Sequence, residues 1–155
     1  MKNIRIYRFA CIACVILLGC SALSAQYYEH SAGIRAGFSS GITYKGFFDR
    51  QEALGIAGLY NRNGLNATVT YQYHFEPFRN DRYLIYVGGG PFSGNWNSEY
   101  SIGMCALAGF EYIMRDLPLV FSVDWRPLLN ILKETSYELL DFGVSIRYRF
   151  EIRGF

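Results

Sequence analysis

Apolar and polar residues alternate with a period of two near the end of the chain. Over residues 141–150, Phe142, Val144 and Ile146 share one parity, while charged or small residues fill the other. Because successive side chains of a strand point to opposite faces, this pattern predicts a strand with one apolar and one polar face. The same alternation recurs in three earlier segments, 64–75, 101–114 and 118–127. The chain is therefore predicted to be all-β.

Turn-forming residues divide the chain into eight predicted strands. Asn63-Gly64 is a strong hairpin signal, and Pro77 and Pro118 lie in further links between apolar segments. The predicted spans are 31–39, 41–48, 53–61, 64–75, 82–91, 101–114, 118–127 and 138–150. Short links alternate with longer ones, and the longest predicted loops are 91–100 and 127–137.

The composition of the two faces predicts which one points outward. The polar parity carries many small residues, including Gly33, Gly103 and Gly143, which suit the narrow interior of an eight-stranded barrel. The apolar parity carries aromatics near strand ends, among them Trp125 and Tyr148, as in the interfacial girdles of a lipid-facing wall. In lipid, strands must close so that no backbone edge is left unsatisfied. We therefore expect an eight-stranded antiparallel up-and-down transmembrane β-barrel.

The first 25 residues have the pattern of an export signal. Lys2, Arg5 and Arg8 precede an apolar run that is too short to span a bilayer as a helix. Two processing routes fit: cleavage between Ala25 and Gln26, or lipidation of Cys20 in a lipobox-like sequence. We expect cleavage after Ala25, which leaves 26–155 as one barrel domain.

Removal of the signal changes the charge and the cysteine count. Lys+Arg falls from 15 to 12 while Asp+Glu stays at 13, so the mature net charge is close to −1. The basic stripe that nucleic-acid binding needs is absent. Cys105 is then the last cysteine left, which excludes an internal disulfide and a cysteine metal cluster. We expect Cys105 to be a small residue that faces a tight interior, and we expect no cofactor.

With an export signal, eight alternating strands and the closing Ser145-Ile-Arg-Tyr-Arg-Phe150, the chain resembles the small outer-membrane barrels typified by the OmpA transmembrane domain and OmpX. The resemblance covers residues 27–150. It implies a place in the Gram-negative outer membrane, among lipid and lipopolysaccharide, after delivery by periplasmic chaperones and the barrel-assembly machinery. It also implies a terminal aromatic as the assembly signal, and both Phe150 and Phe155 fit that role.

Charged residues of the polar parity are predicted to fill the lumen in mutually paired form, because unpaired charges buried there would be costly. On an up-and-down topology Arg126 neighbours Asp141 in the outer half, and Arg82 neighbours Glu111 in the inner half. The predicted lumen charges are Arg35, Lys45, Arg82, Glu111, Asp124, Arg126, Asp141, Arg147 and Arg149.

The predicted function is a structural or surface-interaction role without catalysis. The two histidines, His30 and His74, are predicted at the periplasmic rim, with Glu76 close to His74. An enzyme acting on outer-leaflet lipid A, as hydrolase or acyltransferase, would need its base at the opposite end. That enzyme is the first alternative, and a small-solute pore is the second. Any extracellular ligand is expected on loops 91–100 and 127–137, and the apolar run 127–133 is expected to extend its hairpin or to rest on lipid headgroups.

Overall fold

A computed structural model describes residues 28–132 and 136–151. The predicted cleavage site at Ala25 and Gln26, the alternative lipidation site Cys20, and Phe155 lie outside the described residues. The described residues form ten strands: β1 (His30–Gly37), β2 (Ser40–Phe47), β3 (Glu52–Asn61), β4 (Gly64–Phe75), β5 (Tyr83–Trp96), β6 (Glu99–Ile113), β7 (Leu119–Trp125), β8 (Leu128–Asn130), β9 (Ser136–Glu138) and β10 (Phe142–Phe150).

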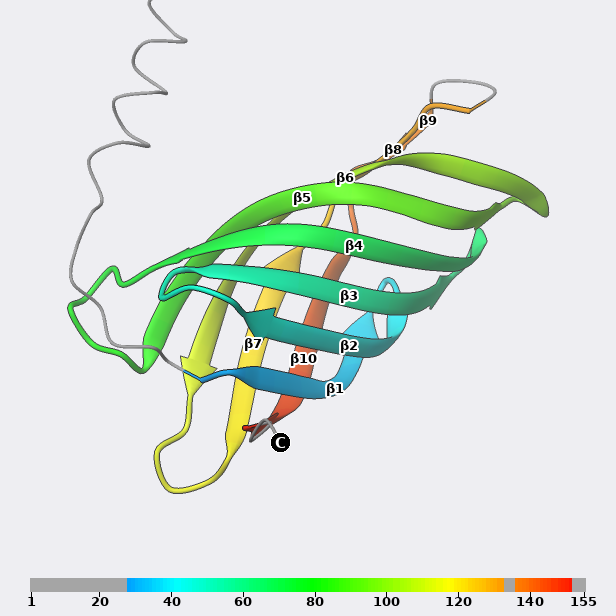
Figure 1. Ribbon diagram of the computed structural model, residues 1–155. Coiled ribbons are helices and arrows are strands. Elements are labelled where there is room, and N and C mark those ends of the chain that lie inside the picture. Colours follow the sequence, from blue (N-terminus) through cyan, green and yellow to red (C-terminus); the bar gives the residue numbers. More distant parts are fainter. Residues whose placement is uncertain (1–27, 133–135, 152–155) are drawn as a thin grey trace, which may run out of the picture.

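These strands close into an antiparallel β-barrel with eight strands around its ring, which confirms the predicted eight-stranded antiparallel up-and-down barrel. Each strand from β1 to β7 pairs with the next, and β10 pairs with both β7 and β1 to complete the ring (Figure 1). The short β8 continues β7 beyond Pro127, and β9 leads into β10. Together β8 and β9 form a hairpin that projects past the barrel wall and pairs with β6.

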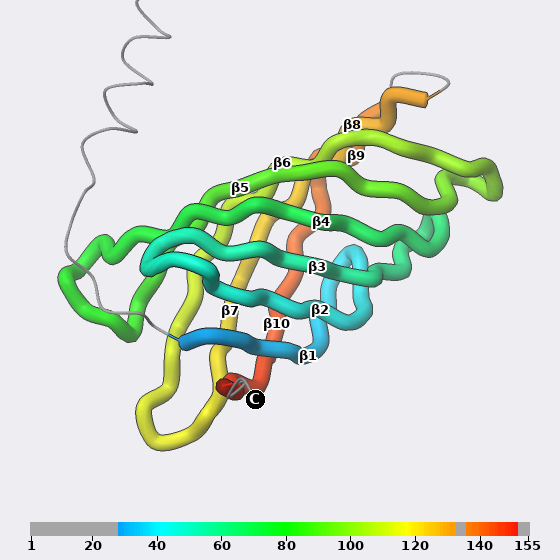
Figure 2. The backbone as a smooth tube through the Cα atoms, viewed as in Figure 1, coloured from blue at the N-terminus to red at the C-terminus, as the bar shows by residue number. Residues whose placement is uncertain are grey.

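The two ends of the barrel differ in what they carry. At the terminal end, β1 begins beside the last residue of β10, with His30 opposite Phe150 (Figure 2). The links β2–β3, β4–β5 and β6–β7 also lie at this end. The hairpin end carries the β1–β2, β3–β4 and β5–β6 turns together with the β8–β9 hairpin. Because the number of strands around the barrel is even, the first and last strands begin and end on the same side of it.

Burial in this barrel is the reverse of that in a water-soluble core. In β10, Val144 and Ile146 are exposed, whereas Ser145 and Arg147 are buried. In β4 the pattern repeats along the strand, with the apolar parity outside and Asn, Thr and Gln inside. In β5, Leu84 and Tyr86 face inward. The predicted polarity of the two faces therefore holds along these strands.

The region 91–100 differs from the predicted long loop. β5 runs to Trp96 and β6 starts at Glu99, so the link is a two-residue turn with positive φ at Asn97 (51°) and Ser98 (69°). Positive φ at both central residues is the turn geometry that matches the twist of a hairpin. Most residues of the predicted loop 91–100 are therefore strand residues. Within the predicted run 127–133, Leu128–Asn130 form β8 and extend the hairpin, which is one of the two predicted placements.

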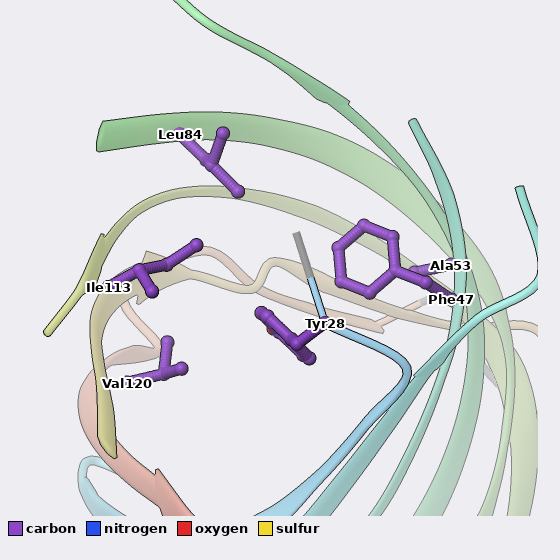
Figure 3. Close-up of a cluster of buried hydrophobic side chains, with 6 residues drawn as sticks. All are labelled: Tyr28, Phe47, Ala53, Leu84, Ile113 and Val120. Carbon is purple, nitrogen blue, oxygen red and sulfur yellow. The ribbon is translucent and has the colours of Figure 1, made fainter. Parts of the chain in front are cut away.

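An apolar cluster closes the lumen at the terminal end. Tyr28, which precedes β1, folds into the barrel mouth and packs edge-on against Phe47, with ring centroids 4.8 Å apart. Figure 3 shows the side chains that converge there, Tyr28 from before β1 and five others from different strands: Phe47, Ala53, Leu84, Ile113 and Val120. A smaller cluster of Phe92, Cys105 and Leu128 lies toward the hairpin end, so Cys105 faces the tight interior as predicted.

Candidate functional site: a charged and filled lumen

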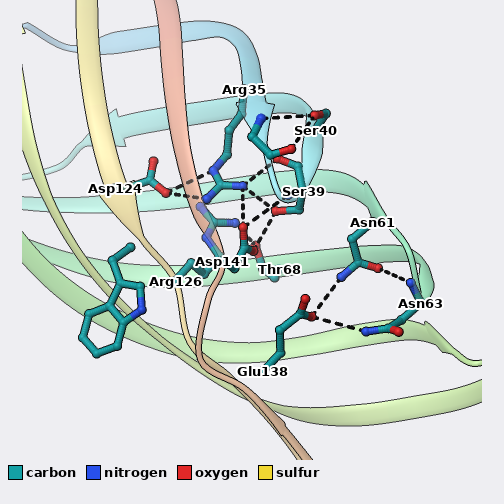
Figure 4. Close-up of polar contacts among 12 residues, drawn as sticks. Arg35, Ser39, Ser40, Asn61, Asn63, Thr68, Asp124, Arg126, Glu138 and Asp141 are labelled. Carbon is teal, nitrogen blue, oxygen red and sulfur yellow. Dashed lines mark hydrogen bonds and ion pairs between the residues drawn. The ribbon is translucent and has the colours of Figure 1, made fainter.

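One lumen cluster places a single cation between two carboxylates. Arg35 of β1 donates from Nε (3.0 Å) and Nη2 (2.8 Å) to Oδ1 of Asp124. Its Nη1 donates to Oδ1 of Asp141 at 3.0 Å and to the Ser39 carbonyl at 2.7 Å. The Ser39 hydroxyl also bonds to Arg35 and donates to Oδ2 of Asp141 at 2.7 Å. All these groups are buried, and Figure 4 shows them converging inside the wall. We call this set the Arg35 cluster.

A glycine explains how Arg35 of β1 reaches Asp124 of β7, which lies two strands away around the barrel. Gly37 of β1 is opposite Gly143 of β10, which is in turn opposite Asp124 of β7. A Cβ on Gly143 would lie 2.4 Å from the Arg35 guanidinium carbon, closer than real contacts allow. The bare backbone at Gly143 thus lets the guanidinium pass over β10 to Asp124. Small residues on the lumen parity are what make room for the large charged ones.

The second lumen cluster has the opposite arrangement, with one carboxylate between two cations. Oε2 of Glu111 accepts from Lys45 Nζ and from Arg147 Nη2, both at 2.7 Å. Its Oε1 accepts from the Tyr28 hydroxyl at 2.5 Å. Glu111 is fully buried, with an exposed fraction of 0%. We call this set the Glu111 cluster; it lies next to the apolar closure of the terminal end.

Tyr28 and His74 complete the surroundings of the Glu111 cluster. Burial, reinforced by the Glu111 carboxylate, raises the pKa of Tyr28 well above its usual value, so the hydroxyl stays a donor. His74 is buried inside the barrel, with Nε2 3.1 Å from Lys45 Nζ and its ring stacked on Tyr86. His74 therefore lies toward the terminal end, but it is buried inside the lumen rather than exposed at the rim as predicted. His74 belongs to the inward-facing parity of β4, so its side chain points into the lumen.

The predicted pairs of neighbouring charges do not form. Asp141 bonds to Arg35 rather than to Arg126, although Arg126 N donates to the Asp141 carbonyl at 2.8 Å. The Arg126 side chain instead donates to Thr68 Oγ1 at 3.1 Å. Glu111 bonds to Lys45 and Arg147 rather than to Arg82, which is partly exposed just before β5.

Arg149, one of the predicted lumen charges, and His30 lie at the terminal rim. Arg149 is half-buried and donates to the carbonyls of Met114 (2.7 Å) and Leu117 (3.2 Å). His30, at the start of β1, lies within hydrogen-bonding distance of Tyr44, with Nδ1 2.7 Å from the hydroxyl. The structure thus places seven of the nine predicted charges deep in the lumen and leaves Arg82 and Arg149 near its terminal end.

Little empty space remains between the two clusters. The cavity there has a volume of about 20 Å³ and is lined by residues of both, including Lys45, Asp124 and Arg147. Its volume suits about one water molecule. In the described part of the chain, the lumen is therefore filled by side chains rather than open along its length.

The hairpin end carries a larger open cleft and a bridge across the mouth. The cleft, of about 600 Å³, lies between the β5–β6 turn and the β8–β9 hairpin, and Trp96, Tyr100 and Asn130 line it. Beside it, Oε2 of Glu138 accepts from the side-chain amides of Asn61 (3.2 Å) and Asn63 (3.3 Å), as Figure 4 shows. Sequence reasoning pointed to this end but not to the bridge, because its partners are 75 or more residues apart.

Three further findings bear on function. Among residues 28–132 and 136–151, no group of three or more His, Cys, Asp or Glu side chains is placed to hold a metal ion. Within the same residues, no helix is long and apolar enough to cross a membrane. The chain matches no protein-family model, and a comparison with curated proteins finds no match.

Proposed function

We propose that this barrel is a bacterial outer-membrane protein with a closed lumen, and that its role is structural or surface-interacting rather than catalytic. The observation that carries the proposal is the inverted burial: charged side chains are inside and apolar side chains cover the outside. Large contiguous apolar surfaces are rare on soluble monomers and mark contact with a membrane or a partner. The export signal predicted over residues 1–25 agrees with this location.

The types of exposed apolar side chain change along the barrel axis as expected for a barrel that spans a bilayer. Aliphatic side chains occupy the middle of the wall, including Ile34 (62% exposed), Ile42 (70%) and Val144 (51%). Exposed aromatics lie toward both ends: Phe48, Tyr71 and Tyr148 at the terminal end, and Phe38, Tyr60 and Phe142 at the hairpin end. Two aromatic zones around an aliphatic belt are typical of transmembrane barrels.

The lumen supports the closed, non-catalytic part of the proposal. Its central cavity of about 20 Å³ is too small to pass solutes, which disfavours a pore. Both histidines lie toward the terminal end, whereas an enzyme acting on outer-leaflet lipid would need a base at the hairpin end. Among the described residues, six of the seven buried charges are bonded to one another, as expected for a structural filling.

A pair of arginine substitutions tests the membrane location. Val144→Arg places a charge in the aliphatic belt, and we expect it to lower the stability of the vesicle-inserted barrel by about 2–4 kcal/mol near the bilayer midplane. Ser98→Arg, at the exposed β5–β6 turn, is the matched control and should change stability little. Urea unfolding of both variants in lipid vesicles measures the difference. Equal stability of the two variants, with the parent protein soluble without detergent, would refute the proposal.

The surface-interaction role assigns the hairpin end to the cell exterior. The cleft beside Trp96 and Tyr100 offers aromatic rings next to amide and carboxylate groups, a surface suited to saccharide or protein. An epitope inserted between Asn97 and Ser98 should be labelled by antibody on intact cells. One inserted after Asn80, in the β4–β5 link, should be labelled only after the outer membrane is permeabilised. The reverse pattern would invert the topology.

A further inference from the structure

The buried charges of the lumen do not balance. Among the described residues, the buried charged side chains are four cations (Arg35, Lys45, Arg126 and Arg147) and three carboxylates (Glu111, Asp124 and Asp141). Even without counting His74, the interior therefore carries one excess positive charge. An uncompensated charge in a low-dielectric interior is strongly unfavourable, so an interior of this kind favours the uptake of a counter-ion.

The excess can be traced to particular residues. The Arg35 cluster has one cation and two carboxylates, and Arg126, which lies close to it, brings that half to neutrality. Arg126 makes no ion pair within the described residues, and it is 5% exposed. The Glu111 cluster has two cations and one carboxylate, so the net positive charge resides on its side of the lumen.

Unpartnered donors surround the small cavity between the two clusters. Arg126 Nε and Arg147 Nε are buried and have no hydrogen-bond partner, and both residues line the cavity. The hydroxyls of Thr43 and Ser145, which line it too, are likewise without a partner. One unpartnered acceptor, Gln72 Oε1, belongs to the same lining. Four donor groups thus surround a space of about 20 Å³, which suits an occupant about as large as one water molecule.

We propose that this cavity holds a small monovalent anion of the halide type, bound by Arg126, Arg147, Thr43 and Ser145. Such an ion supplies the missing negative charge and accepts the unused N–H and O–H donors. A water molecule would satisfy the donors but leave the charge excess in place. The proposal rests on the lumen alone and stands independently of the membrane location.

Bromide is the probe for the experiment. Crystals of the folded mature protein grown in sodium bromide should show an anomalous scattering peak between Arg126 and Arg147. In detergent micelles, sodium chloride or bromide should raise the thermal unfolding midpoint above that in sodium gluconate of equal ionic strength, because gluconate is too large for the cavity. A ligand that binds only the folded state stabilises it in this way.

Two variants and one control make the result specific. Arg126→Met should abolish the anomalous peak and weaken the halide affinity roughly tenfold or more, as expected for the loss of a charge-assisted bond. Ser145→Ala, which is less disruptive to folding, should weaken it by a smaller factor. Arg149→Gln removes a rim cation far from the cavity and should keep the parent's halide response. No bromide peak together with equal midpoints in chloride and gluconate would show a water site and overturn the proposal, as would an undiminished halide response in both cavity variants.

Discussion

The two buried clusters are near mirror images in charge. The Arg35 cluster holds one cation between two carboxylates, and the Glu111 cluster holds one carboxylate between two cations. Each also includes one neutral hydroxyl donor, Ser39 in the first and Tyr28 in the second. Their chemistry differs in one respect: carboxylates can be neutralised by mild acid, whereas Lys and Arg stay protonated. The two clusters should therefore respond differently to pH when their central ion is removed.

The largest expected effect comes from removing the central ion of either cluster. Glu111→Gln leaves Lys45 and Arg147 without their carboxylate, and Arg35→Met leaves Asp124 and Asp141 without their cation. Each change should lower the free energy of unfolding by about 3–5 kcal/mol near neutral pH, because uncompensated charges stay buried. Urea unfolding in lipid vesicles or detergent measures this loss relative to the parent.

Acid should separate these two variants. In Arg35→Met the folded protein gains stability by protonating the two abandoned carboxylates, which the solvated unfolded chain does less readily. Its stability should therefore rise relative to the parent as the pH falls toward about 4. Glu111→Gln leaves two cations that acid cannot neutralise, so its deficit should persist. The same pH response in both variants would contradict the charge arrangement described for the clusters.

Removing a flanking ion should matter less than removing a central one. Lys45→Met leaves the Glu111–Arg147 pair intact, and Asp141→Asn leaves the Arg35–Asp124 pair intact. The expected loss is about 1.5–3 kcal/mol, the range for one hydrogen bond to a charged group. Unfolding midpoints of the flanking and central variants, measured side by side, test the order. Flanking variants as damaging as central ones would show that each cluster acts as an indivisible unit.

The face of each lumen residue was predictable from the sequence, but its partner was not. Parity follows from the period of the strand, so Arg35, Glu111 and Arg147 were assigned to the polar face from the chain alone. Their partners depend on barrel closure, which brings together side chains from strands that are not adjacent or that face each other across the lumen. Reasoning from neighbouring strands therefore paired Arg126 with Asp141, whereas the bare backbone at Gly143 lets Arg35 reach both carboxylates.

Two other differences have local causes. The segment 91–100 is rich in Gly, Asn and Ser, and this composition indicated a loop, yet pairing between β5 and β6 continues through it to Trp96 and Glu99. A tight turn at Asn97 and Ser98 suffices because both residues adopt positive φ. The inward fold of Tyr28 before the first strand carries no periodic signal, since a single residue outside a strand has no parity to interpret.

The smallest expected effect concerns the neutral hydroxyl of each cluster. Tyr28→Phe removes only the bond to Glu111 Oε1 and keeps the ring packed on Phe47. Because Glu111 keeps both cations, the loss should lie at the low end of the range for one hydrogen bond to a charged group, about 1.5 kcal/mol. Since burial holds the pKa of Tyr28 well above its usual value, the hydroxyl is a donor at neutral and acid pH alike, and this loss should not change between them.

Ser39→Ala is the counterpart in the Arg35 cluster: it removes the bond to Asp141 and keeps the carbonyl that accepts from Arg35. Its loss should be of similar size, and a loss in either hydroxyl variant that exceeds the loss in the flanking-ion variants would count against this order of effects.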